Sequence, residues 1–321
     1  MAYKSPYSVT PEMFTFLKEI IRLIGRLEGY QLMAGNVKLR RKNKIKSIAS
    51  SLKIEGNSLS EEQITEILNG KRVLGPKQDV REVQNAIRVY DRLGNVDPYN
   101  EDELLEIHKL MMDGLISDAG KYRQSGVGVV DGQKVIHIAP PPKRVPGLMG
   151  DLFDYLVNYE EDIIIKSCVF HFEFEFIHPF SDGNGRMGRF WQTAILKTVY
   201  PDLAYVPIES IVYERQKGYY DALSQSQHDA DSNAFILYAL ESVKLALAEQ
   251  LDNALSIPDD APSRLEAFGN QIGDSLFQRK DYQSYHKKIS SSTTTRDLTY
   301  GVKQGLLVKS GALRTTQYKF S

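Results

Sequence analysis

Apolar residues recur at helical spacing along most of the chain, and residues that favour helix ends interrupt that pattern. Thr10-Pro11-Glu12 offers a capping hydroxyl, a proline that needs no donor and an acid near the positive helix end. Ser60-Glu61-Glu62-Gln63 forms a capping box, and Gly56-Asn57 is suited to ending a helix. Expected helices cover about 10–33, 37–54, a stretch from 60, 79–93, 101–115, 145–159, 214–227 and 232–256. The pattern predicts a mainly α fold.

One segment departs from helical spacing. Between Val127 and Ile138, β-branched residues flank Asp131-Gly132, a dipeptide suited to a tight turn. Three prolines, from Pro140 to Pro142, then interrupt the chain. The sequence therefore predicts a β-hairpin here.

A second segment has an ambiguous pattern. Phenylalanine alternates with polar residues from Phe170 to Phe176, as in a half-buried strand. A helix would instead bring His171, Glu175 and His178 close together on one side. The local pattern alone leaves both structures open.

Composition divides the chain and sets its class. With 321 residues, 42% of them apolar, the chain can bury the cores of two or three domains. Residues 257–262 have the composition of a linker. We expect an N-terminal helical region over 1–95, a core over 96–256 and a C-terminal domain over 263–321.

Cysteine use and the N-terminus indicate a compartment. The one cysteine, Cys168, has apolar neighbours and is expected to be a buried structural thiol. The first residues lack an apolar signal core, and every apolar run is too short to span a bilayer. We expect a cytoplasmic protein with no membrane partner.

The C-terminal domain differs from the rest in charge. From Pro262 onward there are ten Lys/Arg and four Asp/Glu, a net charge of +6, whereas the whole chain carries −1. Helices are expected over 281–289 and 293–303, followed by a hairpin of 306–309 with 316–320. This order resembles a winged helix-turn-helix, with Arg296 projecting from its second helix. Residues 281–319 are a candidate surface for duplex DNA, and protein docking or dimerisation is an equal alternative.

The segment 183–189 has the composition of an anion site. Gly183, Asn184 and Gly185 can take positive φ angles, so their backbone N–H groups could converge into a nest before a helix. Arg186 and Arg189 lie three apart, near a helix start where cations are disfavoured. We expect an anion to compensate them.

Two further side chains complete a set suited to phosphoryl chemistry. Asp182 offers a hard oxygen of the kind that Mg²⁺ uses when it also binds phosphates. His178 can act as a base near neutral pH. A base, a metal ligand, a backbone cradle and arginines together point to phosphoryl-group transfer.

These residues match a family signature at every specified position. The signature of the Fic family is His-x-Phe-x-Asp/Glu-Gly-Asn-Gly-Arg-x-x-Arg, and its positions are occupied here by His178, Phe180, Asp182, Gly183, Asn184, Gly185, Arg186 and Arg189. The resemblance implies a Fic-type helical bundle with a hairpin flap and a helix before His178. It also implies a protein adenylyltransferase that uses ATP, Mg²⁺ and a target protein with a Ser, Thr or Tyr hydroxyl.

The resemblance also implies residue roles. His178 would take the hydroxyl proton while the oxygen attacks the α-phosphorus of ATP, and Asp182 would hold Mg²⁺. Gly183 to Gly185 and Arg186 would hold the phosphates, and Arg189 would meet the γ-phosphate.

Two peripheral regions have implied roles as well. His137 and Ile138 would lie on the flap that aligns a target segment by strand addition. Tyr219 and Tyr220 resemble the region that encloses adenine in Fic proteins.

A second motif suggests a brake. Ser51, Glu55 and Gly56 match the family's inhibitory motif, Ser/Thr-x-x-x-Glu-Gly/Asn, on a helix expected over about 37–56. A glutamate near a helix C-terminus opposes the helix dipole and so suggests a partner cation. By resemblance, Glu55 would pair with Arg189 in the γ-phosphate site and hold the enzyme inactive.

Other functions fit the same residues. A DNA-binding transcriptional regulator could carry a vestigial Fic core, and a Fic-type enzyme could use another donor or run the reverse reaction. The resemblance also allows a homodimer.

Overall fold

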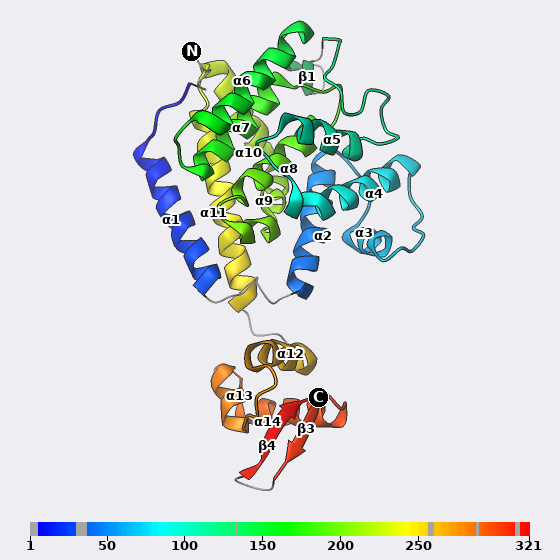
Figure 1. The fold of residues 1–321 in the computed structure, drawn as a ribbon, viewed down its shortest axis with the longest axis vertical. Helices are drawn as coiled ribbons and strands as arrows, with labels where there is room; N and C mark the ends of the chain where they lie inside the picture. Colours follow the sequence, from blue (N-terminus) through cyan, green and yellow to red (C-terminus); the bar gives the residue numbers. More distant parts are fainter. Residues whose placement is uncertain are drawn as a thin grey trace. The chain divides into compact units, whose positions relative to one another are not determined.

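The computed structural model describes residues 6–29, 37–126, 128–131, 134–255, 260–286, 289–311 and 315–321. Within these residues the chain is mainly α-helical with two small antiparallel hairpins, as the sequence predicted (Figure 1). The chain forms two compact units, Met1–Leu251 and Asp252–Ser321, and each is described separately.

The first unit contains most of the helices. Their bounds are α1 Pro11–Gly29, α2 Val37–Ile54, α3 Glu61–Leu68, α4 Lys77–Arg92, α5 Glu101–Met111, α6 Val145–Asn158, α7 Ile163–Ile177, α8 Asn184–Leu196, α9 Ile208–Glu214, α10 Gln216–Asp229 and α11 Asn233–Leu255. Short 3₁₀ helices are η1 Leu93–Asn95, η2 Pro142–Arg144 and η3 Pro201–Tyr205. The hairpin strands are β1 Gly128–Asp131 and β2 Lys134–Ile138.

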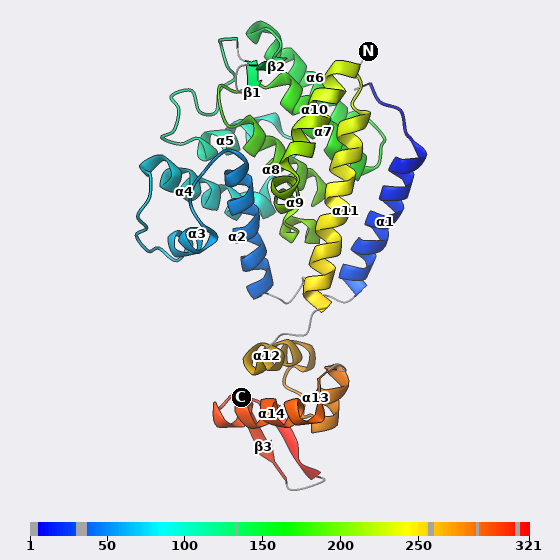
Figure 2. The same cartoon turned by 180° about the vertical axis from the view of Figure 1, so that it is seen from behind.

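Helix α7 forms the centre of this unit. It is buried along nearly its whole length and packs against α6 and α8. The alternating phenylalanines therefore belong to a helix. Its aromatic and its polar side chains both face protein, which explains why the sequence shows no clear helical period. Trp191 and Phe190 on α8 are also fully buried. On the outside, α1 lies along α11 (Figures 1 and 2), where Lys244 pairs with Glu19 at 3.4 Å.

Several predicted helix ends are confirmed. The capping box of α3 joins Ser60 and Gln63 reciprocally. Helix α2 ends at Ile54, and Gly56 has a φ of 88°. Cys168 is buried, as expected.

Other boundaries differ from the prediction. The expected helix 214–227 corresponds to α10, shifted by two residues, and the sequence did not predict α9, which ends just before it at Glu214. Helix α9 begins after Pro207 and is too short to show a clear period in the sequence. Residues 30–33 of the expected first helix lie outside the described part of the chain.

The second unit has three helices and a hairpin. They are α12 Ala261–Ile272, α13 Arg279–Tyr285, α14 Ser291–Lys303, β3 Leu307–Ser310 and β4 Gln317–Phe320. The sequence analysis missed α12, which starts inside the expected linker because Asp260 caps it. Residues 257–259 of that linker lie outside the described residues. Leu265, Phe268 and Tyr282 contribute to a separate apolar core.

An ion pair lies inside this small core. Arg264 Nε donates to Asp297 Oδ2 at 2.7 Å, and Arg264 Nη2 donates to Asp297 Oδ1 at 2.8 Å. The Tyr282 hydroxyl donates to the same carboxylate at 3.1 Å. Asp297 is fully buried, so its charge depends on these donors.

No helix in the part of the chain that the structure covers has the length and apolar character needed to cross a bilayer.

Asp297→Ala should destabilise the second unit by about 3–5 kcal/mol, because it removes the carboxylate that pairs with the buried Arg264 guanidinium. Differential scanning calorimetry of the full chain would show the transition of this unit at a lower temperature. Lys280→Ala, an exposed change on α13, should leave that transition within about 0.5 kcal/mol. Equal shifts for the two variants would contradict the role given to the pair.

Candidate active site

The loop between α7 and α8 holds the histidine in an unusual backbone conformation. Helix α7 ends at Ile177, and His178 follows with φ 50° and ψ 61°, which is rare for a residue with a side chain. Asn184 closes the loop, because its side chain accepts from Phe180 N and donates to Phe180 O, both at 2.9 Å. The half-buried His178 is therefore fixed at the start of a tight loop.

The expected nest is replaced by a helix start. Of the three residues proposed for it, Gly183 alone has a positive φ, 86°, while Asn184 and Gly185 belong to the first turn of α8. The donors of this region are thus the first backbone N–H groups of α8, which have no intrahelical acceptors. A side chain at Gly183 would also collide with Met112, since a Cβ there would lie 2.7 Å from its Sδ.

Asp182 and Arg186 interact beside this helix start. Asp182 Oδ1 accepts from Gly183 N at 2.6 Å and from Arg186 Nη2 at 3.1 Å. Arg186 also lies 3.7 Å from Glu82 on α4. The Asp182 side chain is 54% exposed, so it remains accessible from solvent.

The donor set bears on metal binding. No cluster of three His, Cys, Asp or Glu side chains suited to a metal occurs among the residues that the structure covers. Mg²⁺ commonly binds through one or two carboxylates together with substrate phosphates. An exposed Asp182 next to free helix-start donors fits that mode, and it does not fit an all-protein metal cage.

Arg189 is buried against the end of α2. Its Nη2 donates to Glu55 Oε1 at 2.7 Å and to Ser51 O at 3.0 Å, and its Nε donates to Ser51 Oγ at 3.3 Å. Burial disfavours the charged guanidinium, but Glu55 and other nearby acidic groups outweigh that effect and raise the pKa of Arg189. This is the pairing that the family resemblance implied.

The Glu55 carboxylate also stands over the first turn of α8. A Cβ at Gly185 would lie 2.5 Å from Glu55 Oε1 and 3.0 Å from Arg189 Nη1. Glu55 is therefore positioned where an anion bound to the start of α8 would lie. An anionic ligand of Arg189 has to compete with this carboxylate.

A second carboxylate, Glu175, lies deeper; the sequence placed it near His171 but gave it no role. Burial raises the pKa of Glu175 to about 7, against the opposing effect of Arg189 and with a smaller contribution from Glu55. His171, one turn earlier on α7, lies 3.8 Å away, and burial lowers its pKa to about 3. A hydrogen bond from Tyr219 to Glu175 favours the ionised carboxylate and so opposes the rise in the pKa of Glu175.

Two side chains that the sequence analysis assigned no role hold the loop. Arg123 is buried and donates to His178 O at 2.7 Å and to Pro140 O at 2.6 Å, which joins the loop to the segment after β2. The His108 ring stacks on the Phe180 ring, with 3.5 Å between the ring centres, and His108 Nε2 contacts Asp182 O at 3.0 Å. Arg123 and His178 are 55 positions apart in the sequence, and His108 and Asp182 are 74 apart, so no local pattern could have revealed these contacts.

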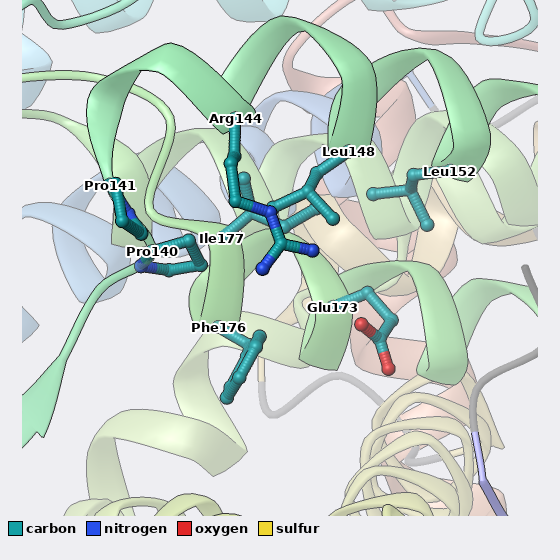
Figure 3. Close-up of a pocket in the computed structure, with 8 residues that line it drawn as sticks. All are labelled: Pro140, Pro141, Arg144, Leu148, Leu152, Glu173, Phe176 and Ile177. Atoms are coloured by element: carbon teal, nitrogen blue, oxygen red, sulfur yellow. The ribbon is translucent and has the colours of Figure 1, made fainter.

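A pocket of about 290 Å³ opens next to the histidine loop. Its walls are mostly apolar and include Pro140, Leu148 and Ile177. Figure 3 shows Arg144 from the end of η2 and Glu173 from α7 projecting into it. The pocket therefore combines an apolar lining with one group of each charge.

The peripheral site predictions have mixed outcomes. Tyr219 is only 2% exposed, and its hydroxyl contacts His171 Nε2 at 3.2 Å, so it is a core residue and not a surface for a base. Tyr220 points elsewhere, because neighbours on a helix diverge by about 100°, and it is 39% exposed. His137 and Ile138 pair with Val129 and Gly128 in the hairpin, and their side chains lie outside the described part of the structure.

Known proteins resemble this chain in sequence and in fold. The model of the Fic/DOC family matches residues 98–196. A crystal structure of a Fic family protein from Desulfovibrio desulfuricans is 37% identical, covers 99% of this chain and 98% of its own, and has a TM-score of 0.76. Fic-1 from C. elegans aligns at 21% identity over 75% of this chain and 72% of its own, with a TM-score of 0.61, which supports the fold.

Two curated relatives carry an activity in their names. Protein adenylyltransferase Fic of Nematostella vectensis is 25% identical over 71% of this chain, and that of Culex quinquefasciatus is 27% identical over 76%. The chain spans only 54% and 49% of the lengths of these two relatives.

Glu175→Gln should change how stability depends on pH. The folded pKa of Glu175, about 7, lies above its ordinary value of 4.5, so the folded chain keeps a proton that the unfolded chain has lost. The protonated Glu175 carboxyl contributes fully to the free energy of unfolding below pH 4.5, and this contribution is lost as pH rises through about 7. Urea unfolding should show Glu175→Gln gaining stability relative to the parent, by about 3 kcal/mol at most, between pH 4.5 and 8. A constant difference across that range would contradict a buried protonated carboxyl.

Proposed function

The chain belongs to the Fic family, and on that premise we propose that it is a protein adenylyltransferase that transfers AMP from ATP to a protein hydroxyl. The observation that carries the proposal is the folded signature loop, with His178 at one end and the donors of the α8 start at the other. The names of the curated relatives support the same activity.

The proposed reaction uses the loop in a simple way. The hydroxyl of a target Ser, Thr or Tyr gives its proton to His178 while its oxygen bonds to the α-phosphorus of ATP. The bond from that phosphorus to the pyrophosphate oxygen breaks, and pyrophosphate leaves. The N–H groups of Gly183 to Gly185 and the Arg186 guanidinium hold the phosphates. Mg²⁺, held by Asp182 together with phosphate oxygens, would neutralise charge on the phosphates.

We further propose that the chain inhibits itself through Glu55. Its carboxylate lies 2.7 Å from Arg189 Nη2 and stands over Gly185, so it competes with a γ-phosphate for both the arginine and the helix start. Ser51 supports this arrangement, because its carbonyl and hydroxyl oxygens also accept from Arg189. Helix α2 ends at Ile54, and Glu55 follows it directly in the turn formed with Gly56, whose φ is 88°.

The hairpin is proposed to dock the target. An extended segment could add to an edge of β1 and β2, near His137 and Ile138. Arg123 joins the residues after β2 to His178, so a segment held by the hairpin would keep a fixed distance to the base.

Glu55→Gly should raise AMP transfer by about ten-fold or more, because it removes the anion that competes for Arg189. The full chain is incubated with ATP and Mg²⁺, and added AMP is measured by mass spectrometry on the chain itself and on lysate proteins. His178→Ala in the Glu55→Gly background should abolish the adduct.

Lys53→Gly is a matched control, since it places a glycine in the same helical turn and leaves Glu55 intact. It should transfer AMP at the parental rate. Equal rates in Glu55→Gly and the parent would refute the brake, and the absence of any adduct in Glu55→Gly would refute the transferase.

Duplex DNA binding by the second unit is a second candidate function. Ser292, Thr295, Arg296 and Thr299 form one exposed polar face of α14. Arg264 does not add to it, since that residue is held by Asp297 in the core. Hydroxyls and a cation on an exposed helix next to a hairpin suit contacts to DNA phosphates.

Arg296→Ala should weaken the binding of random-sequence duplex DNA and reduce the slope of log affinity against log salt by about 1. Fluorescence anisotropy with labelled duplex across a salt series measures both. Lys217→Ala, which removes an exposed cation from the first unit, should change neither. If the parent shows no salt-dependent binding, the second unit does not bind DNA.

A further inference from the structure

We propose that a groove lined by α2, α3, α4 and η3 binds a phosphorylated small molecule that carries a planar ring, of the size of a mononucleotide. The cavity measures about 430 Å³, which is in the range of small-molecule sites. Helices α2, α3 and α4 lie together on one side of the first unit (Figures 1 and 2). None of its lining residues belongs to the histidine loop or to the start of α8.

Charge in the groove favours an anion. Arg40, Arg41 and Lys44 line it, and Asp91 is the one carboxylate among the lining residues. Lys44 pairs with Asp91, so the lining keeps a net charge of two positive units. Arg41 is exposed and donates to the side chain of Asn69. Guanidinium groups bind phosphate through paired, charge-assisted hydrogen bonds.

The other walls of the groove suit a ring. The Arg40 guanidinium lies 4.4 Å from the centre of the Tyr205 ring, which gives the groove a stacked cation and aromatic edge. Leu68, Leu93 and Ala204 add apolar surface. A bare phosphate would leave this surface and most of the volume unused. The lining therefore favours a phosphate joined to a planar group over an inorganic ion.

The floor of the groove leads toward the candidate active site. Ser47 Oγ donates to Glu209 Oε2 at 2.9 Å, and the Tyr90 hydroxyl donates to Glu209 Oε1 at 2.7 Å. Glu209 is buried, and burial raises its pKa against the opposing effects of these donors and, more weakly, of Arg189. Arg189, which pairs with Glu55, is thus close enough to the Glu209 carboxylate at the floor of the groove to act on it electrostatically.

Helix α2 also connects the two sites directly. Arg40, Arg41, Lys44 and Ser47 on its first half line the groove, and Glu55 lies at its C-terminal end. A ligand that bridges α2 to α4 and η3 stabilises the docked position of α2. This regulatory consequence rests on the proposed inhibitory role of Glu55: occupancy of the groove strengthens the brake.

Isothermal titration calorimetry of the full chain with guanosine monophosphate, which is not the proposed donor, tests the site without any turnover. Arg41→Glu should weaken binding at least about ten-fold, because it replaces a phosphate contact by a repulsive charge. Lys42→Glu changes the neighbouring exposed residue, which does not line the groove, and should leave affinity within about two-fold. Arg186→Ala should also leave it unchanged, since that residue belongs to the signature loop.

Several outcomes would overturn the site. These are no binding up to millimolar ligand, equal weakening by Arg41→Glu and Lys42→Glu, or loss of binding in Arg186→Ala. A titration with inorganic phosphate tests whether the ring of the ligand contributes to binding. If inorganic phosphate binds as tightly as guanosine monophosphate, the groove does not recognise a ring. Arg41 and Lys42 are exposed, so their charge reversals should not disturb the fold, whereas Arg186 is buried; thermal unfolding checks all three variants.

The regulatory arm is measured separately by AMP transfer in the parent chain. Guanosine monophosphate should lower self-modification in the parent and have no effect in Arg41→Glu or in Glu55→Gly. If guanosine monophosphate still binds to His178→Ala while no variant transfers AMP, the proposed transferase is refuted and the groove site stands. Binding with unchanged transfer in the parent would overturn the coupling alone.

Discussion

The first unit is organised around a buried guanidinium that must have an anion. Arg189 lies in the second turn of α8, and its side chain is only 2% exposed. An uncompensated charge there would be too costly, so a carboxylate from elsewhere in the chain has to reach it. Glu55 supplies it from α2, which makes the docking of α2 and the electrostatics of the site one problem. In the proposed enzyme, ATP binds productively only where it replaces that anion.

Rigidity of the loop has a different origin. His178 keeps a left-handed backbone conformation that has an intrinsic cost, and it persists because surrounding groups hold the chain there. The Asn184 side chain accepts from Phe180 N inside the loop. Arg123 donates to the carbonyl of His178, and the His108 ring stacks on Phe180. Burial lowers the pKa of His108 to about 4, which suits a neutral ring used for packing. Of the two histidines at this loop, His108 packs against Phe180, and His178 is the proposed base.

Polar groups inside the protein connect sites that are far apart in sequence. Glu209 joins the groove on α2 to the surroundings of Arg189, and Glu175 places a second carboxyl under the same guanidinium. In the second unit the Arg264–Asp297 pair is buried in the same way, so one of its ten basic residues is structural. Buried charges therefore determine which cations remain available for ligands.

The sequence by itself determined the helical class, the hairpin, the capping of α3 and the signature loop, because these depend on periodicity, turn residues and fixed local spacing. It also fixed the spacing of Ser51 and Glu55 on one helical face. The local pattern left Phe170 to Phe176 open between strand and helix, since burial on every side hides the period; the family resemblance implied a helix, and the structure has one there. Only the tertiary structure decided that Tyr219 lies in the core. The contacts of Arg123, His108 and Glu175, and the groove on α2, join segments distant in the chain. Such proximity is created by packing, so no local pattern carries it.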